Sequence, residues 1–321
     1  MLKFIISRLI YGIAALWITA TLTFILMHNL PGEPFSSSKI VPTSIMKNLR
    51  IKYGLDKPIM EQYGIYMKNL IKGDLGLSMV YSNRSVNGMI TRNLPVTADL
   101  ALKALILTVF IGIPLGFISA LNRRTWIDRS GMFVAMLGVS IPGFILGTLI
   151  QYGVCFQLSN YLQSLTGSDL RLLPITGWGT FRHTIAPSIT LSLGGAAMTA
   201  RLTRSSILRV LDEDYIVGAK AKGLKQGQII RKHVVKNAMI PVVSIVGTIV
   251  TTVFLGSFVV ENIFSVPGLG QYFVSSVQSK DYTMIMGLAM FAVFITVTAN
   301  TLTDIAYGLM DHRIKVAGWR R

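Results

Sequence analysis

Long apolar segments constrain this chain more than any other feature of its sequence. Six of them reach or approach the roughly 20 residues that a helix needs to cross the hydrocarbon layer. They are Leu9–His28, Ala98–Leu121, Met132–Leu158, Ile185–Ala200, Ala238–Val260 and Met284–Leu309. The fourth is the shortest and contains Ser, Gly and Thr. The pattern predicts an all-α integral membrane protein with six transmembrane helices.

Composition excludes several other classes of protein. The chain of 321 residues is 51% hydrophobic and only 14% charged, whereas soluble domains carry about 25% charged residues. Its one cysteine, Cys155, lies in an apolar segment, so we expect neither an internal disulfide nor a cysteine-based zinc site. The four histidines are too scattered for a metal site, and no H-E-x-x-H or G-x-S-x-G motif indicates catalysis.

The positions of Lys and Arg predict the orientation of the spans. If both termini are cytoplasmic, the inner segments hold Lys3 and Arg8, three arginines between residues 123 and 129, and a cluster between residues 201 and 236. The two shorter outer loops hold only Arg171, Arg182 and Lys280. The net charge of +17 is therefore a signal of membrane topology, and we expect no nucleic-acid partner. The first span is too long for a secretory signal and no cleavage site follows it, so we expect it to be retained.

A polar, basic stretch, residues 212–241, separates two of the apolar segments. Asp212 or Asp214 is a suitable cap for a short helix, whose apolar contacts would include Tyr215, Ile216 and Ala219. Gly223 suits the left-handed conformation that ends a helix, and a second helix is expected from about Gln226 to Asn237. Two short helices at a glycine corner beside a membrane would form a docking surface for another protein.

The same stretch resembles the cytoplasmic coupling loop of ATP-binding-cassette (ABC) importer permeases. The runs DYIVGAKAKGL and RKHVVKNAMIPVV are most similar to the dipeptide, oligopeptide and nickel branch, although Val217-Gly218-Ala219 stands where the general loop has Glu-Ala-Ala. Further segments, including RNLPVTADLAL, SIPGFILGTLI and FSVPGLGQYF, match the branch in the same order. The residues that carry the coupling motif are Asp214, Tyr215, Ala219, Ala221, Lys222, Gly223 and Leu224.

This resemblance implies a type I ABC importer permease in the cytoplasmic membrane of a prokaryote, and the chain resembles the oligopeptide permease B-type subunit. The expected partners are a second homologous permease, two ABC ATPases and an extracellular substrate-binding protein, and Ala219 is expected to face the ATPase. The spacing of Gly218 and Gly223 suggests a phosphate-binding loop, but Leu224-Lys225 replaces the Lys-Ser/Thr that such a loop needs. We therefore expect no cofactor and no enzyme activity in this chain, and ATP and Mg to bind the partner ATPases.

The apolar segments, together with the resemblance, predict how the chain is divided. The expected parts are an N-terminal tail and first span (1–28), an extracellular segment (29–97), a permease core (98–309) that includes the coupling loop 201–237, and a cytoplasmic tail (310–321). Within the extracellular segment, residues 45–53 and 58–70 have the pattern of two short amphipathic helices. We expect this segment to be a lid packed on the outer face, and an independent domain is the alternative.

Two groups of residues are candidates for the translocation route. Thr248, Thr251 and Thr252 form a polar stripe on the fifth span, and Thr296, Asn300 and Asp304 share a face of the sixth. These groups either line a water-filled pathway or hydrogen-bond neighbouring helices. The outer loop between these spans is either a gate or an ordinary packed loop, with four candidate residues: Phe264, Pro267, Leu269 and Tyr272.

The expected function is ATP-driven uptake of peptides by alternating access. A nickel or other small-solute importer of the same branch is the alternative, because the receptor largely selects the substrate. A secondary carrier and a non-transporting membrane scaffold are the alternatives from other classes. The absence of a central intramembrane carboxylate, together with a coupling loop, favours the ATP-driven importer.

Overall fold

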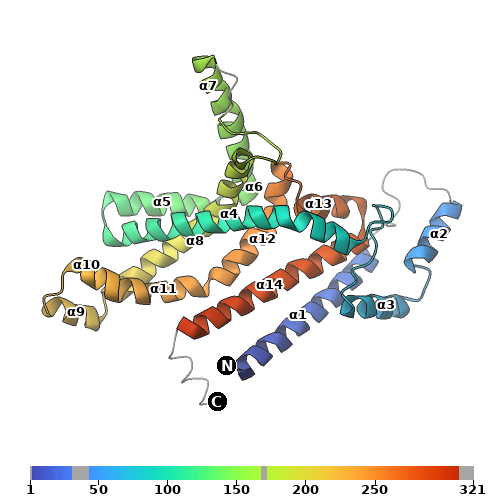
Figure 1. Cartoon of the computed structure of the whole chain (residues 1–321), viewed down its shortest axis with the longest axis horizontal. Helices are drawn as coiled ribbons and strands as arrows, with labels where there is room; N and C mark the ends of the chain where they lie inside the picture. Colours follow the sequence, from blue (N-terminus) through green and yellow to red (C-terminus); the bar gives the residue numbers. More distant parts are fainter. Residues whose placement is uncertain (1, 31–42, 168–171, 311–321) are drawn as a thin grey trace.

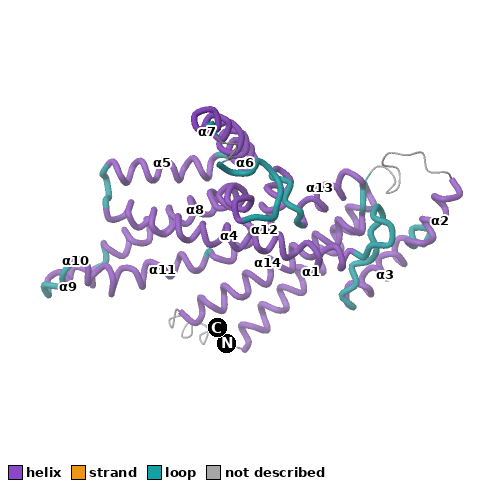
Figure 2. The backbone as a smooth tube through the Cα atoms, turned by 45° about the horizontal axis from the view of Figure 1, so that its top comes forward, coloured by secondary structure: helices purple, strands orange, loops and turns teal. Residues whose placement is uncertain are grey.

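The chain folds into helices that run mainly along one long axis (Figure 1). The computed structural model describes residues 2–30, 43–167 and 172–310. These residues contain no strand, only one isolated antiparallel bridge between Leu77 and Ser85, and helices make up most of them (Figure 2). The expectation of an all-α protein is confirmed.

The helices differ widely in length, because several of the expected apolar segments are broken into shorter helices. In chain order they are α1 (Leu2–Asn29), α2 (Thr43–Tyr53), α3 (Ile59–Ile71), α4 (Val86–Leu121), α5 (Trp126–Ser140), α6 (Gly143–Ile150), α7 (Ser159–Thr166), α8 (Phe181–Leu211), α9 (Asp214–Ala221), α10 (Gln226–Ile229), α11 (Val235–Ser244), α12 (Val246–Ile263), α13 (Leu269–Ser279) and α14 (Tyr282–Met310). Two π-helical pieces, η1 (Gln151–Leu158) and η2 (Ile230–Val234), continue α6 and α10.

Four of the described helices are each long and apolar enough to cross a membrane. They are α1, α4, α12 and α14, and the bent pair formed by α5 and the helical stretch Gly143–Thr166 would make a fifth span. The expected third span, Met132–Leu158, is not straight, because the chain bends by 106° between these two pieces. Pro142 explains the break, since proline pushes the residue before it out of helical geometry, and Ile141 has φ −89° and ψ 125°.

The expected fourth span, Ile185–Ala200, forms the first part of the longer helix α8. This helix packs closely against α4 through small residues. A Cβ at Gly112 would lie 2.7 Å from the carbonyl oxygen of Ala196, and one at Gly116 would meet that of Ala200. Glycines four residues apart let two helix backbones approach in this way, which explains the close packing of α8 on α4.

The expected fifth span, Ala238–Val260, is divided between α11 and α12 by a break at Ile245. The sixth, Met284–Leu309, corresponds to α14, which lies beside α1 (Figure 1). An ion pair joins these two helices, because Nε of Arg8 lies 3.0 Å from a carboxylate oxygen of Asp304.

The two amphipathic helices expected before α4 are present as α2 and α3. A network around the buried side chain of Asp281, at the start of α14, holds the loop that follows them. Asp281 accepts hydrogen bonds from the hydroxyl of Ser78 and from the backbone N–H of Met79 (3.1 Å). The Tyr53 hydroxyl donates to the Ser78 carbonyl (2.7 Å), and burial, followed by the charge of Asp281, raises the pKa of Tyr53. Tyr53 therefore stays protonated as a donor.

Candidate functional site

The predicted glycine corner lies at the end of the long axis opposite α2 and α3 (Figure 1). Helix α9 ends at Ala221, and Gly223 then adopts a positive φ of +76°, with its N–H donating to the carbonyl of Lys220 (2.9 Å). No other atom lies within 4 Å of a Cβ built on Gly223, so its backbone conformation alone requires glycine. The expected left-handed turn is confirmed.

The ends of the two corner helices differ from the sequence-based expectation. The N-cap of α9 is Glu213, whose side chain makes no capping hydrogen bond, so capping by Asp212 or Asp214 is wrong. The second helix does not end near Asn237. It continues through η2 and α11 to Ser244, because the apolar residues that follow Asn237 pack into the core.

One face of α9 is buried within the chain itself. Ile216 is fully buried and Ala219 is 7% exposed, and both pack against Ile207, Ile229 and Val234. Ala219 therefore faces inward, not toward a partner as expected.

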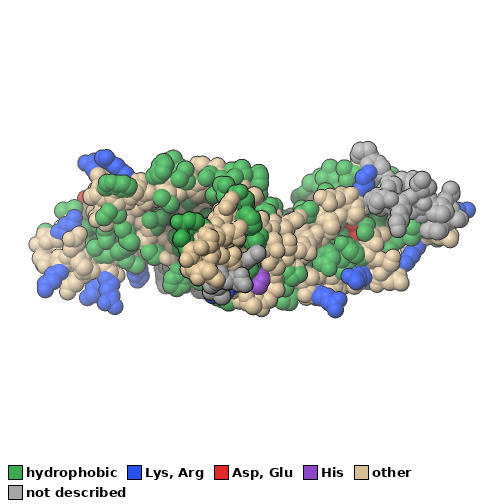
Figure 3. Space-filling view, turned by 90° about the horizontal axis from the view of Figure 1, so that it is seen from above, with side chains coloured by type: hydrophobic (Ala, Val, Ile, Leu, Met, Phe, Trp, Pro, Cys, Tyr) green, Lys and Arg blue, Asp and Glu red, His purple; other side chains and the backbone are tan. Residues whose placement is uncertain are grey.

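The other motif residues lie on the exposed side of α9 or in the turn after it. Tyr215 and Val217 present large exposed side chains there, and Tyr215 accepts a hydrogen bond from Asn237 of α11 (3.0 Å). The corner thus has a buried inner face and an exposed outer face formed by Asp214, Tyr215, Val217, Ala221, Lys222, Gly223 and Leu224. Lys and Arg side chains lie around it, and others lie near the opposite end of the molecule (Figure 3).

A bidentate ion pair fixes the helix that leads into the corner. Arg204 of α8 donates through Nε (2.6 Å) and Nη2 (2.7 Å) to the carboxylate of Asp128 on α5. Asp128 also accepts from the backbone N–H of Arg124 (3.0 Å), and its side chain is only 5% exposed. Sequence reasoning missed this pair, since its partners lie 76 residues apart.

The predicted pathway residues do not form one lining. Thr251 and Thr252 donate to carbonyls of their own helix, as Thr296 does on α14. Asn300 packs against the start of α12, where a Cβ at Gly247 would lie 2.6 Å from its Oδ1. Thr248, Thr252 and Asn300 are exposed in the single chain, whereas Asp304 pairs with Arg8.

Three of the four predicted gate residues pack inside the chain, and one is exposed. Phe264 and Leu269 are buried in two separate hydrophobic clusters, Tyr272 packs against the second of them, and Pro267 is exposed. Glu261, which the sequence analysis did not select, lies beneath this loop and is fully buried. It follows the last residue of the expected fifth span, so the pattern placed it in a loop, yet α12 continues to Ile263.

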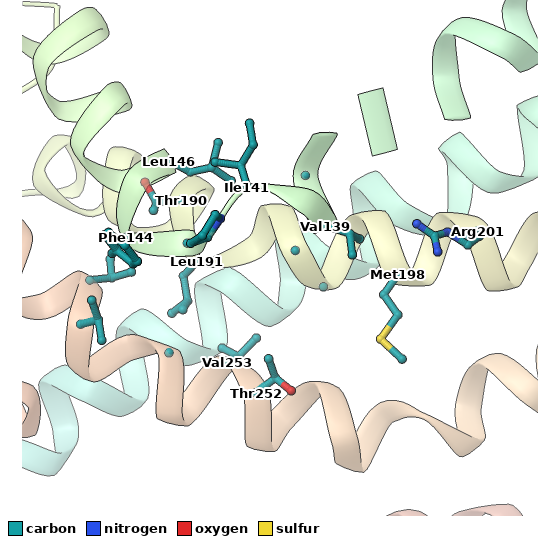
Figure 4. A pocket seen from close by; sticks show the side chains of 18 residues that line it. Val139, Ile141, Phe144, Leu146, Thr190, Leu191, Met198, Arg201, Thr252 and Val253 are labelled. Carbon is teal, nitrogen blue, oxygen red and sulfur yellow. The ribbon is translucent and has the colours of Figure 1, made fainter. Parts of the chain in front are cut away.

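A cavity of about 650 Å³ opens between α5 and α6 on one side and α8 and α12 on the other (Figure 4). Its walls are mainly apolar side chains and glycines, with hydroxyls from Thr190 and Thr252. Arg201 lies at one end, where α8 runs on toward the corner. Of the predicted pathway residues, Thr252 alone lines this cavity. No group of three or more His, Cys, Asp or Glu side chains within the described residues is arranged to hold a metal ion.

Two family models match almost the whole chain. Residues 112–316 match the binding-protein-dependent transport system inner membrane component, and residues 1–101 match the N-terminal part of the same kind of membrane component. The chain belongs to this family. It is therefore an integral component of the cytoplasmic membrane.

Relatives within the family are similar over nearly their full length. The chain is 41% identical over 318 residues to the dipeptide transport system permease protein DppB of Bacillus subtilis (strain 168), covering 98% of this chain and 99% of that protein. It is 35% identical over 317 residues to the oligopeptide transport system permease protein OppB of Haemophilus influenzae, covering 98% and 100%. The resemblance to this branch of permeases is confirmed.

A solved structure supports the fold at lower sequence similarity. A chain of the MetNI methionine ABC transporter in an inward-facing conformation superposes with a TM-score of 0.55 at 18% identity. The match covers 70% of this chain and 97% of that chain. The match supports a shared fold over that part of the chain.

Proposed function

We propose that this chain is a transmembrane subunit of an ATP-driven importer that takes up peptides. The observation that carries the proposal is the near-full-length similarity to dipeptide and oligopeptide permeases. The exposed α9 surface at the end of α8 adds independent support, because an importer subunit without its own nucleotide site needs a surface on which an ATPase docks.

In this proposal the chain has six spans, with the corner and both termini in the cytoplasm. Its partners are a homologous permease, two ATPases that bind ATP and Mg, and an extracellular substrate-binding protein. The docking residues are those of the α9 corner: Asp214, Tyr215, Ala221, Lys222, Gly223 and Leu224, with Ala219 supporting them from the buried side. The gate is the loop that carries Phe264, Pro267, Leu269 and Tyr272.

The coupling step requires a difference in affinity between two states. The ATP-bound ATPase pair must bind the outward-facing arrangement of the permeases more tightly than the inward-facing one. The Arg204–Asp128 pair supports such a mechanism, since it ties α5 to the helix that ends at the corner, so that the two helices move together. Hydrolysis would then return the bundle to the inward-facing state.

The test is reconstitution of the chain with its candidate partners in vesicles. We expect ATP-dependent uptake of a labelled tripeptide only when the second permease, the ATPases and the binding protein are all present, and no saturable ATP binding by the chain alone. Uptake of nickel without peptide uptake would favour the small-solute alternative. Uptake driven by an ion gradient without the ATPases would contradict the proposal and favour a secondary carrier.

A further inference from the structure

The charge in the cavity between α5, α6, α8 and α12 is unbalanced. Arg201 is the only charged side chain among the described residues that line it, and no carboxylate lines it. Arg204, one turn further along α8, is neutralised by Asp128, whereas Arg201 is exposed and makes no ion pair within the described part of the chain. Arg204 therefore has a carboxylate as its counter-ion, whereas Arg201 has none within the described part of the chain.

Arg201 lies on the face of α8 that borders the cavity. Leu191, Gly194, Met198 and Arg201 recur at three- to four-residue spacing and share one face of α8. In Figure 4 the guanidinium extends from the ribbon toward the side of Val139 and Met198. Arg201 precedes the end of α8 at Leu211 by about 15 Å along the helix axis. Arg201 is thus about two and a half to three helical turns away from the glycine corner, although it is the first residue of the basic cluster between residues 201 and 236.

The remaining walls suit a ligand whose side chains vary. Glycines from α5, α8 and α12 line the cavity, and a Cβ at Gly194 would meet nothing closer than 3.8 Å. The hydroxyls of Thr190 and Thr252 donate to their own helices, so they remain available mainly as acceptors. The volume lies in the usual range for small-ligand sites, about 300–1,000 Å³. Walls of this kind exclude few of the side chains that a ligand could carry. Among the described residues, the one charged group that would orient a ligand is the guanidinium of Arg201, which binds an anion.

We propose that Arg201 binds the terminal carboxylate of a peptide in transit, while the apolar cavity accommodates its side chains. This inference rests on the proposed function of the chain as a peptide permease. A guanidinium is suited to this task, because its planar fork of donors matches the two oxygens of a carboxylate. The site gives every unmodified peptide the same point of attachment whatever its side chains are.

The test compares trialanine with trialanine amide, which lacks the carboxylate, in the reconstituted importer. Arg201→Gln should lower the ratio of acid to amide uptake about tenfold, the effect of losing one charged hydrogen-bonded contact. Arg201→Lys should retain much of the ratio, and Arg209→Gln, an exposed arginine of the same helix outside the cavity, should leave it unchanged. Because all variants use the same binding protein, its own preference cancels from the comparison.

A second measurement does not depend on transport. In nanodiscs of zwitterionic lipid, which offer no anionic headgroup, Thr252→Cys should be protected from a small thiol reagent by trialanine. Trialanine amide should protect it less, and Arg201→Gln should remove the difference.

The remaining outcomes separate a failure of the proposed function from a failure of the role of Arg201. If the unmodified complex takes up neither peptide, the proposed function fails. If it takes up both and Arg201→Gln lowers both equally, Arg201 supports folding or a partner contact, and the inference fails while the function stands. An Arg201 effect that appears only in anionic lipid would assign the side chain to a headgroup, which also overturns the inference.

Discussion

The backbone N–H of Gly270 donates to a carboxylate oxygen of Glu261 at 2.7 Å, in a site from which solvent is excluded. The neighbouring N–H of Leu269 donates to the hydroxyl of Thr97 at 2.9 Å. The first two amides of α13 are thus held by one side chain from α12 and one from α4. The other oxygen of Glu261 has no hydrogen-bond partner. A carboxylate at a helix N-terminus is favoured electrostatically, and here it fixes the proposed gate to two spans.

The first prediction concerns this contact. Glu261→Ala should destabilise the chain by about 1–3 kcal/mol, because it leaves the buried N–H of Gly270 unsatisfied. Glu261→Gln should cost less, since its amide oxygen can still accept. Thermal unfolding of the purified chain in detergent measures both, with the exposed Asn262→Ala as the control. Equal losses for the Gln and Ala variants would show that the acceptor is not what matters.

The second prediction concerns Gly223. A side chain at φ +76° costs about 1–2 kcal/mol, so Gly223→Val should redirect α10 without disturbing the spans. We expect normal insertion but a loss of substrate-stimulated ATP hydrolysis in the assembled complex. Gly227→Ala is the matched control, because this glycine has neither a positive φ nor a close neighbour. Full ATPase stimulation in Gly223→Val would contradict a coupling role for the corner.

The third prediction concerns Asp128 and Arg204. Removing either partner should cost about 1.5–3 kcal/mol, the range for hydrogen bonds to charged groups. The double variant Asp128→Asn with Arg204→Gln should lose less than the sum of the two single losses, because neither charge is then left alone. The midpoint of thermal unfolding for all three variants measures this coupling. Additive losses would mean that the ion pair contributes nothing of its own.

The fourth prediction addresses the polar face of α14. If Asn300 faces a water-filled pathway, a cysteine there should react with a charged thiol reagent, and its rate should change when ATP is bound. Leu302 provides the control, because its side chain is 62% exposed and apolar, and we expect lipid to cover it. Protection of Asn300→Cys in every nucleotide state would favour helix packing as the role of this face.

Much of the fold could be predicted from local patterns in the sequence. The apolar lengths of α1, α4 and α14, the two short helices before α4 and the turn at Gly223 depend on residues close together in the chain. Hydrophobic periodicity and the backbone preferences of single residues act between neighbours in the chain, so these elements can be predicted from the order of the residues. The break at Ile141 was also encoded locally by Pro142, but it lay inside an apolar run that otherwise favoured one span.

The candidate site required the tertiary structure. A residue pattern cannot distinguish a face that meets lipid from one that meets another helix, since both are apolar. Ala219 therefore looked like a docking residue until the packing of α9 placed it against Ile207 and Ile229. In the same way, an arginine beside a span indicates only which side of the membrane it occupies. Only the arrangement of α5, α8 and α12 separates Arg204, paired with Asp128, from Arg201, which lines a cavity without an acid.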